Sequence, residues 1–154
     1  MPLHIPITES REISQAEYEI SQVPPEENNV VAIVTVIADQ TLGSKDITVN
    51  IPTGATITKV TALARINIIN DTATAQVVDL ILEVEGVAIF DQENVIGFPA
   101  VANSSGAYVI AEDASDEVTD DGQVVTLEAK ATISAAAAVR FQVQYYLFIT
   151  YKMG

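Results

Sequence analysis

The residues from Val139 to Lys152 alternate in polarity with a period of two, and this pattern constrains the fold more than any other feature of the chain. The odd positions are all apolar or aromatic: Val139, Phe141, Val143, Tyr145, Leu147, Ile149 and Tyr151. A helix repeats every 3.6 residues and does not produce such a pattern, so the segment is predicted to be a long β-strand with its odd face in a core. The even face starts polar and turns aromatic at Tyr146 and Phe148, which predicts an apolar contact there.

Strand signals recur along the rest of the chain, and no segment has the pattern of an amphipathic helix. Turn residues separate the predicted strands, which cover 30–38, 47–51, 57–69, 78–84, 87–90, 107–111, 125–133 and 139–152. The continuous β-branched run at 30–38 is typical of a strand covered on both faces, whereas residues 91–106 are predicted to form a long loop. Together these patterns predict an all-β protein, a two-sheet antiparallel β-sandwich in the form of an eight-stranded jelly roll. The alternative is an immunoglobulin-like sandwich, which usually has seven shorter strands, a tryptophan and a cysteine pair.

The chain divides into a polar acidic N-terminal arm, residues 1–29, and a β-sandwich domain, residues 30–154. The arm holds six acidic residues and one basic residue, and ends in a Pro-Pro-Glu-Glu-Asn-Asn segment that breaks regular structure. Residues 14–21 favour a short helix, although their pattern is weak. The apolar residues Ile5, Ile7 and Ile13 predict that the arm lies across the sandwich of its own subunit or of a neighbour.

The net charge of −14 is concentrated in this arm and in residues 112–121, which contain six acidic residues and no basic one. Nucleic-acid binding and adhesion to anionic lipids both need a basic surface, so neither partner is expected. The first residues also lack the basic and apolar segments of a secretory signal, and no apolar run is long enough for a membrane-spanning helix. Such acidity is typical of a protein kept in solution by its charge.

The residues that most enzymes use are scarce. The chain has no cysteine, and its single histidine, His4, lies in the arm. Ser-His-Asp and Cys-His arrangements are therefore excluded, and the sequence has no phosphate-binding glycine loop and no zinc-binding helix motif. A hydrolase with paired carboxylates stays formally open, but its sugar site usually contains tryptophan and this chain has none. We expect a protein that is not an enzyme and has no cofactor.

One acidic segment supports a hypothesis of metal binding. Asp113, Asp116, Asp120 and Asp121 lie within ten residues, and carboxylate oxygens are the ligands that calcium prefers. The spacing differs from the EF-hand pattern, so the alternative is a solvated loop that charge repulsion keeps extended.

Three features together resemble small single-jelly-roll structural proteins of virus particles, namely the capsid, decoration and fibre-head proteins of phages and archaeal viruses. They are the polar arm, the segment IPTGATITKV at residues 51–60 and the aromatic last strand FQVQYYLFITYK at residues 141–152. The resemblance implies location in the virion and partners that are copies of the chain or other virion proteins. Because the arm is acidic, it implies an outer position without genome contact.

The sequence therefore predicts a structural protein that assembles with itself through Tyr146, Phe148, Ile5, Ile7 and Ile13, in a closed ring by analogy with virion proteins. The alternative is a β-sandwich module that binds a ligand such as a carbohydrate.

Two further predictions concern packing. Arg65 and Arg140 are expected either to pair with Glu83, Glu85 or Glu128 across strands, or to lie at a subunit contact. The core is predicted to contain Leu80, Leu82, Leu127, Phe141, Val143 and Leu147.

Overall fold

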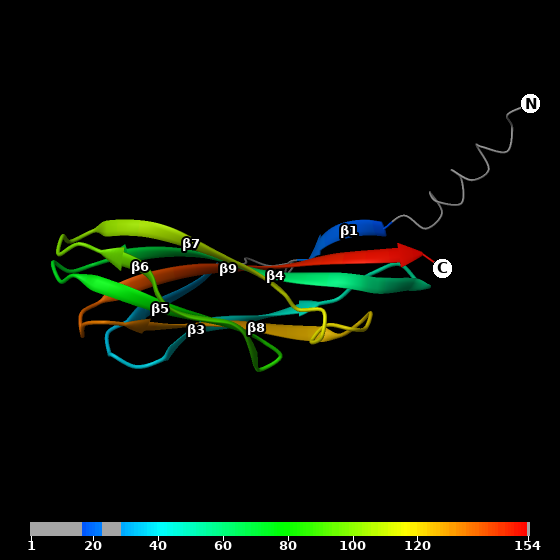
Figure 1. Cartoon of the computed structure of the whole chain (residues 1–154), viewed down its shortest axis with the longest axis horizontal. Helices are drawn as coiled ribbons and strands as arrows, with labels where there is room; N and C mark the ends of the chain where they lie inside the picture. The colour runs from blue at the N-terminus through cyan, green and yellow to red at the C-terminus, as the bar shows by residue number, and fades with distance from the viewer. Residues whose placement is uncertain (1–16, 23–28, 154) are drawn as a thin grey trace, which may run out of the picture.

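The computed structural model describes residues 17–22 and 29–153, and regular structure in this part of the chain is entirely β (Figure 1). The strands are β1 (Glu17–Gln22), β2 (Asn29–Val34), β3 (Gln40–Thr48), β4 (Ala55–Asn70), β5 (Gln76–Val84), β6 (Val87–Phe98), β7 (Ser104–Asp113), β8 (Val124–Ile133) and β9 (Val139–Met153). The described residues contain no helix long and apolar enough to cross a membrane. The all-β prediction is confirmed, with nine strands instead of eight.

The strands form two antiparallel sheets packed face to face as a sandwich (Figure 1). In the five-stranded sheet, β1 and β2 lie one after the other along β9, followed by β4 and β7, while the four-stranded sheet has the order β3-β8-β5-β6. Strands β2 to β9 pair in a nested series, β2 with β9, β3 with β8, β4 with β7 and β5 with β6. This is the strand order of a jelly roll, and β1 is an addition to it.

The core lies between the two sheets and is built by the alternation seen in the sequence. The inward side chains of β9, from Val139 to Ile149, are buried, whereas the intervening ones are partly or fully exposed. The predicted core residues are all buried: Leu80, Leu82, Leu127, Phe141, Val143 and Leu147. Each strand contributes every second residue to the core. The register of β9 therefore determines which of its residues lie on the outer face of the sheet.

Tyr145 joins the two sheets through its hydroxyl group. The side chain is buried, and its oxygen accepts the N–H of Ala129 on β8 at 2.7 Å and donates to the carbonyl of Gly43 on β3 at 2.6 Å. Gly43 lies at a β-bulge with φ of 97°, where a Cβ would stand 2.1 Å from the Cγ1 of Val30. Burial raises the pKa of the Tyr145 hydroxyl, so the neutral donor is favoured.

Three sequence predictions about local structure are wrong. The expected short helix at 14–21 is contradicted by β1, because Glu17–Gln22 pair with the end of β9. The expected loop at 91–106 is mostly strand, since pairing with β5 and β4 extends β6 to Phe98 and starts β7 at Ser104. The expected covered strand at 30–38 ends at Val34, and no described residue covers its outer face.

Candidate interaction surface

The outer face of the five-stranded sheet carries two of the predicted contact residues, Tyr146 and Phe148. Its two central strands, β4 and β9, point alternate side chains outward, and their register sets these side by side. Leu63 lies opposite Tyr146, and Thr61 lies opposite Phe148. On the other side of β4, Arg65 lies opposite Val109 of β7. The face therefore combines aromatic, aliphatic and basic groups drawn from three strands.

Five of these side chains line a shallow depression of about 430 Å³, which we call the aromatic hollow. Its residues are Leu63, Arg65, Val109, Tyr146 and Phe148. The Tyr146 and Phe148 rings are stacked, with centroids 6.3 Å apart and planes at 23°. Each ring shields the other, so both are half-buried and less exposed than the alternation predicts. Val109 is 54% exposed, which leaves the hollow open to solvent on that side.

Arg65 is an exposed cation beside the aromatic hollow and forms no ion pair with any described residue. The other arginine on this face is paired, because the Arg140 Nε lies 2.8 Å from the Asp71 carboxylate. That hydrogen bond raises the pKa of Arg140.

The predicted pairing of both arginines with Glu83, Glu85 or Glu128 is wrong. Glu83 and Glu128 belong to the four-stranded sheet and Glu85 follows its strand β5, so these carboxylates are not cross-strand neighbours of the arginines.

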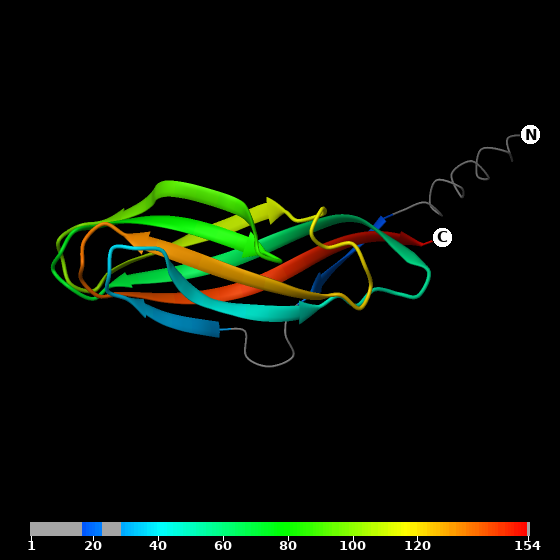
Figure 2. The same cartoon turned by 90° about the horizontal axis from the view of Figure 1, so that it is seen from below.

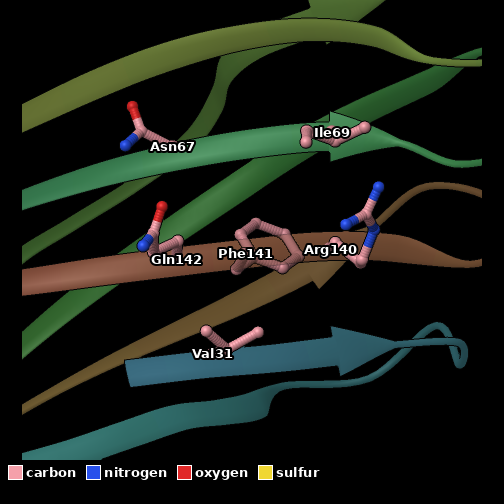
Figure 3. A pocket seen from close by; sticks show the side chains of 6 residues that line it. All are labelled: Val31, Asn67, Ile69, Arg140, Phe141 and Gln142. Carbon is pink, nitrogen blue, oxygen red and sulfur yellow. The ribbon is translucent and has the colours of Figure 1, made fainter. Parts of the chain in front are cut away.

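A second depression of about 250 Å³ lies on the same face, which we call the amide hollow (Figure 3). It is lined by Val31, Asn67, Ile69, Arg140, Phe141 and Gln142. Asn67 and Gln142 are cross-strand neighbours, so their amide groups lie together. Amides and a guanidinium offer several hydrogen-bond donors and acceptors above an aliphatic surface. This arrangement suits a small polar ligand.

The outer face of the four-stranded sheet is different, because its charged groups compensate one another. The Nζ of Lys130 lies 2.9 Å from Glu83 and 3.7 Å from Glu128. The hydrogen bond with Glu83 raises the pKa of Lys130. Beside them, the Thr126 hydroxyl donates to Asp46 at 2.7 Å. These polar groups are satisfied within the chain.

The acidic segment that follows β7 is a compact turn at one end of the sandwich, not an extended loop. Ala114 and Val118 are buried in the core. The N–H of Ala114 donates to the carbonyl of Val60 at 2.8 Å, and the N–H of Val60 donates to the Ser115 hydroxyl at 2.9 Å. Gln123 closes the turn by donating to the carbonyl of Glu117 at 2.8 Å.

The four aspartates proposed as calcium ligands have separate local roles in this turn. Asp113 accepts hydrogen bonds from the side chain and N–H of Ser115, which lower its pKa. Asp121 accepts the N–H of Ile51 at 3.0 Å, and Asp120 pairs with the Thr119 hydroxyl at 3.2 Å. Asp116 is exposed. Among residues 17–22 and 29–153, no three acidic, histidine or cysteine side chains are grouped so that they could hold a metal ion. The calcium site stays a prediction.

Of the predicted contact residues, the structure brings together Tyr146 and Phe148, while Ile5, Ile7 and Ile13 lie outside the described residues. The sequence analysis did not select Leu63 and Val109. Leu63 has a signal in the sequence, because it is an apolar residue between Thr61 and Arg65 on the outward face of an alternating strand. Val109 has none, since only the pairing of β7 with β4 places it beside Arg65.

No protein-family model matches the chain, and a search of curated protein sequences gives no match. Among solved structures, it is similar to latent PorU of Porphyromonas gingivalis, at 8% identity and a TM-score of 0.44 over 91% of this chain and 13% of that one. It is also similar to the structure of infectious bursal disease virus strain Gt, at 10% identity and a TM-score of 0.45 over 89% and 33%.

Capsid proteins and a sugar-binding domain both occur among the similar structures. The cyanophage Pam1 capsid has 16% identity and a TM-score of 0.35 over 90% of this chain and 86% of that one. The EclA C-terminal domain, described as a sugar-binding protein, has 15% identity and a TM-score of 0.37 over 88% and 78%. At these scores the likeness does not distinguish one function from another.

Proposed function

We propose that this chain is a non-enzymatic structural protein that assembles with copies of itself, as a capsid, decoration or appendage subunit of a virus particle. The observation that carries the assembly is the aromatic hollow. Stacked rings, aliphatic side chains and an exposed arginine meet there on the outside of a sheet. The placement on a virion rests on the jelly-roll strand order, which many capsid subunits share, and is an analogy of fold.

The composition of the aromatic hollow is that of a protein–protein contact. Aromatic residues and arginine are enriched in such contacts, whereas lysine and acidic residues are depleted. Both rings are already ordered by stacking, so little side-chain entropy is lost when a partner covers them. Arg65, which has no ionic partner among the described residues, can then bind a carboxylate of an acidic partner, and this chain, with a net charge of −14, is itself acidic.

The test is sedimentation of the full chain over a wide range of concentrations. We expect an oligomer, and we expect Tyr146→Glu combined with Phe148→Glu to dissociate it while the circular dichroism stays β-rich. The control is Val77→Glu combined with Val124→Glu, which places the same charges on the outer face of the other sheet and should leave the oligomer intact. A monomer at high concentration contradicts the proposal.

The second candidate function is a β-sandwich module that binds a carbohydrate, and the amide hollow is the observation that favours it. Paired amides, a guanidinium and a flat aliphatic surface are groups that bind hydroxylated ligands. A glycan-binding screen of the full chain, repeated with Asn67→Ala and Gln142→Ala, separates the two candidates. A monomer that binds a glycan and loses it in these variants would replace the structural role.

A further inference from the structure

The strand β2 forms an edge of the sandwich that differs from all the other described edges. It lies at one long side of the molecule beside β3, as the lighter blue arrow at the lower left of Figure 2 shows. Within the described residues it pairs with β9 on one side and with no strand on the other. Its sequence, Asn-Val-Val-Ala-Ile-Val, contains no charge, no proline and no glycine. Every other edge strand carries charged residues: Glu17 and Glu19 in β1, Lys45 and Asp46 in β3, Asp91 and Glu93 in β6, and Glu112 and Asp113 in β7.

Charges and bulges on edge strands are the means by which soluble β-proteins prevent pairing with other chains. In the four-stranded sheet, both edges also have register shifts, between Thr41 and Ser44 of β3 and at two places along the pairing of β5 with β6. The pairing of β2 with β9 is regular from Asn29 to Val34. Among the described residues, strand β2 is therefore an edge with a regular register and with neither of these two forms of protection.

The side chains around this edge are also unusually exposed for their type. Val31 is 66% exposed and Ile33 is 62% exposed, and in the bend that follows β2, Val36 is 48% and Ile37 is 59% exposed. The run from Val30 to Ala38 reads in sequence as a strand covered on both faces. The described residues of the chain cover only its inner face. The difference between the sequence pattern and the observed burial indicates that something outside the single sandwich covers the rest.

We propose that the edge of β2 binds the β2 strand of a second copy, antiparallel and about a two-fold axis, so that the five-stranded sheets of two subunits become continuous. The charge of the chain favours a second copy at this place. Two molecules of net charge −14 repel one another, and the stretch from Val30 to Ala38 carries no charge at all. An antiparallel pair of identical strands is also self-complementary, so one edge supplies both halves of the contact.

The proposed contact is independent of the aromatic hollow and adds to the assembly proposed above. A two-fold contact joins two subunits and then closes. A larger assembly needs another contact on a different surface, and the aromatic hollow supplies it. The β2 pairing rests on the proposed self-assembly only for its biological role. The observations that support it come from β2, which contributes no residue to the aromatic hollow.

The first test measures the mass of the full chain in the background of Tyr146→Glu combined with Phe148→Glu, which removes the other contact. We expect a dimer whose dissociation constant rises at least about tenfold in Val31→Lys and Ile33→Lys, because a charge at the contact is desolvated on pairing. The matched control is Val124→Lys, a valine 54% exposed on the outer face of the other sheet, which should leave the dimer unchanged. A monomer in this background, or equal effects of all three variants, overturns the β2 pairing. Assembly through the aromatic hollow is tested separately by comparing the masses of the unmodified chain and of this double variant, because a contact through the hollow makes the unmodified assembly larger than a dimer.

The second test locates the two-fold axis. The chain has no cysteine, so single cysteines placed in turn from Val30 to Val34 are the only thiols present. In an antiparallel two-fold pair, only the residue nearest the axis faces its own copy closely enough for a disulfide. We expect one position, or two adjacent ones, to give a covalent dimer on mild oxidation. Uniform cross-linking at all five positions, or none, contradicts the proposal.

Hydrogen exchange distinguishes a second copy at this edge from the alternative occupant, which is a segment of the same chain. Protection of the β2 amides in a dimer increases with protein concentration. Protection that is complete in a monomer and independent of concentration would show that the chain covers its own edge, and would overturn the pairing of two copies.

Discussion

The two outer faces of the sandwich cover the same core but are built differently. On the four-stranded sheet, Lys130 is held by Glu83 and Glu128, and its neighbours hydrogen-bond to each other. On the five-stranded sheet, Arg65 has no ionic partner among the described residues and adjoins the stacked rings of Tyr146 and Phe148. Both faces expose valines, such as Val124 on one and Val109 on the other. The four-stranded face holds Lys130 between carboxylates, whereas the five-stranded face gathers stacked rings beside an arginine that has no ionic partner among the described residues.

This difference indicates that the buried core of a β-sandwich does not determine which partners the protein binds. Both sheets point apolar residues inward, and residues from both are buried in the core. Residues on the outer faces are free to vary without loss of the core, and so they carry the information about partners. An apolar group retained on a solvent face is therefore more informative than a buried one.

The largest expected effects test whether the two sheets share one core. Leu127→Ala in β8 and Leu147→Ala in β9 each remove a fully buried side chain, one from each sheet. Each should lower the free energy of unfolding by about 2–5 kcal/mol, because the lost contacts leave a cavity. Denaturant unfolding with a single transition measures both values. A loss below about 0.5 kcal/mol in either variant would mean that its strand has another register.

A smaller effect is expected at the connection between the sheets. Tyr145→Phe leaves the N–H of Ala129 and the carbonyl of Gly43 without their shared hydroxyl partner. The variant should lose about 1–3 kcal/mol, the usual penalty for buried polar groups left unpaired. Tyr151→Phe on the same strand is the matched control, and it should be nearly neutral since this residue is only partly buried. Equal losses in both would argue against the connection.

The same hydroxyl gives the core a dependence on alkaline pH. Burial raises the pKa of Tyr145 above the value of about 10 for an exposed tyrosine. Above that pH the unfolded chain releases the proton and the folded one keeps it, so stability is complete below about pH 10 and falls as pH rises further. The slope from this residue is at most about 1.4 kcal/mol per pH unit. Unfolding curves on either side of that pH should show a steeper fall in the unmodified chain than in Tyr145→Phe.

The smallest effects on stability distinguish the outer faces themselves. Lys130→Gln removes the centre of a surface ion-pair group and should lower the melting temperature slightly, without any change in assembly. Arg65→Gln removes a cation that has no ionic partner within the described residues, so the melting temperature of the isolated subunit should not change. Its effect should instead appear as weaker association in sedimentation. The reverse pattern would contradict the contrast between the faces.

Much of the fold could be predicted because its signals are local. The alternation in residues 139–152 fixed a long strand and its inward face, and the buried leucines followed from the same period of two. Predictions failed where local signals compete with pairing. Gly97 suggests a loop, yet pairing with β5 keeps it in β6, and β1 is a strand only because β9 is beside it.

The sequence by itself determined the all-β class, the alternation of the core and the lack of the usual catalytic residues, because each depends on residue type and on neighbours one or two positions apart. Only the tertiary structure decided which outward side chains meet. Leu63, Val109 and Tyr146 lie on three strands that are distant in the chain, and the cross-strand register alone brings them into one hollow. It also showed that the described residues cover the apolar run at β2 on one face only, since coverage depends on what packs against a strand and not on the composition of the strand.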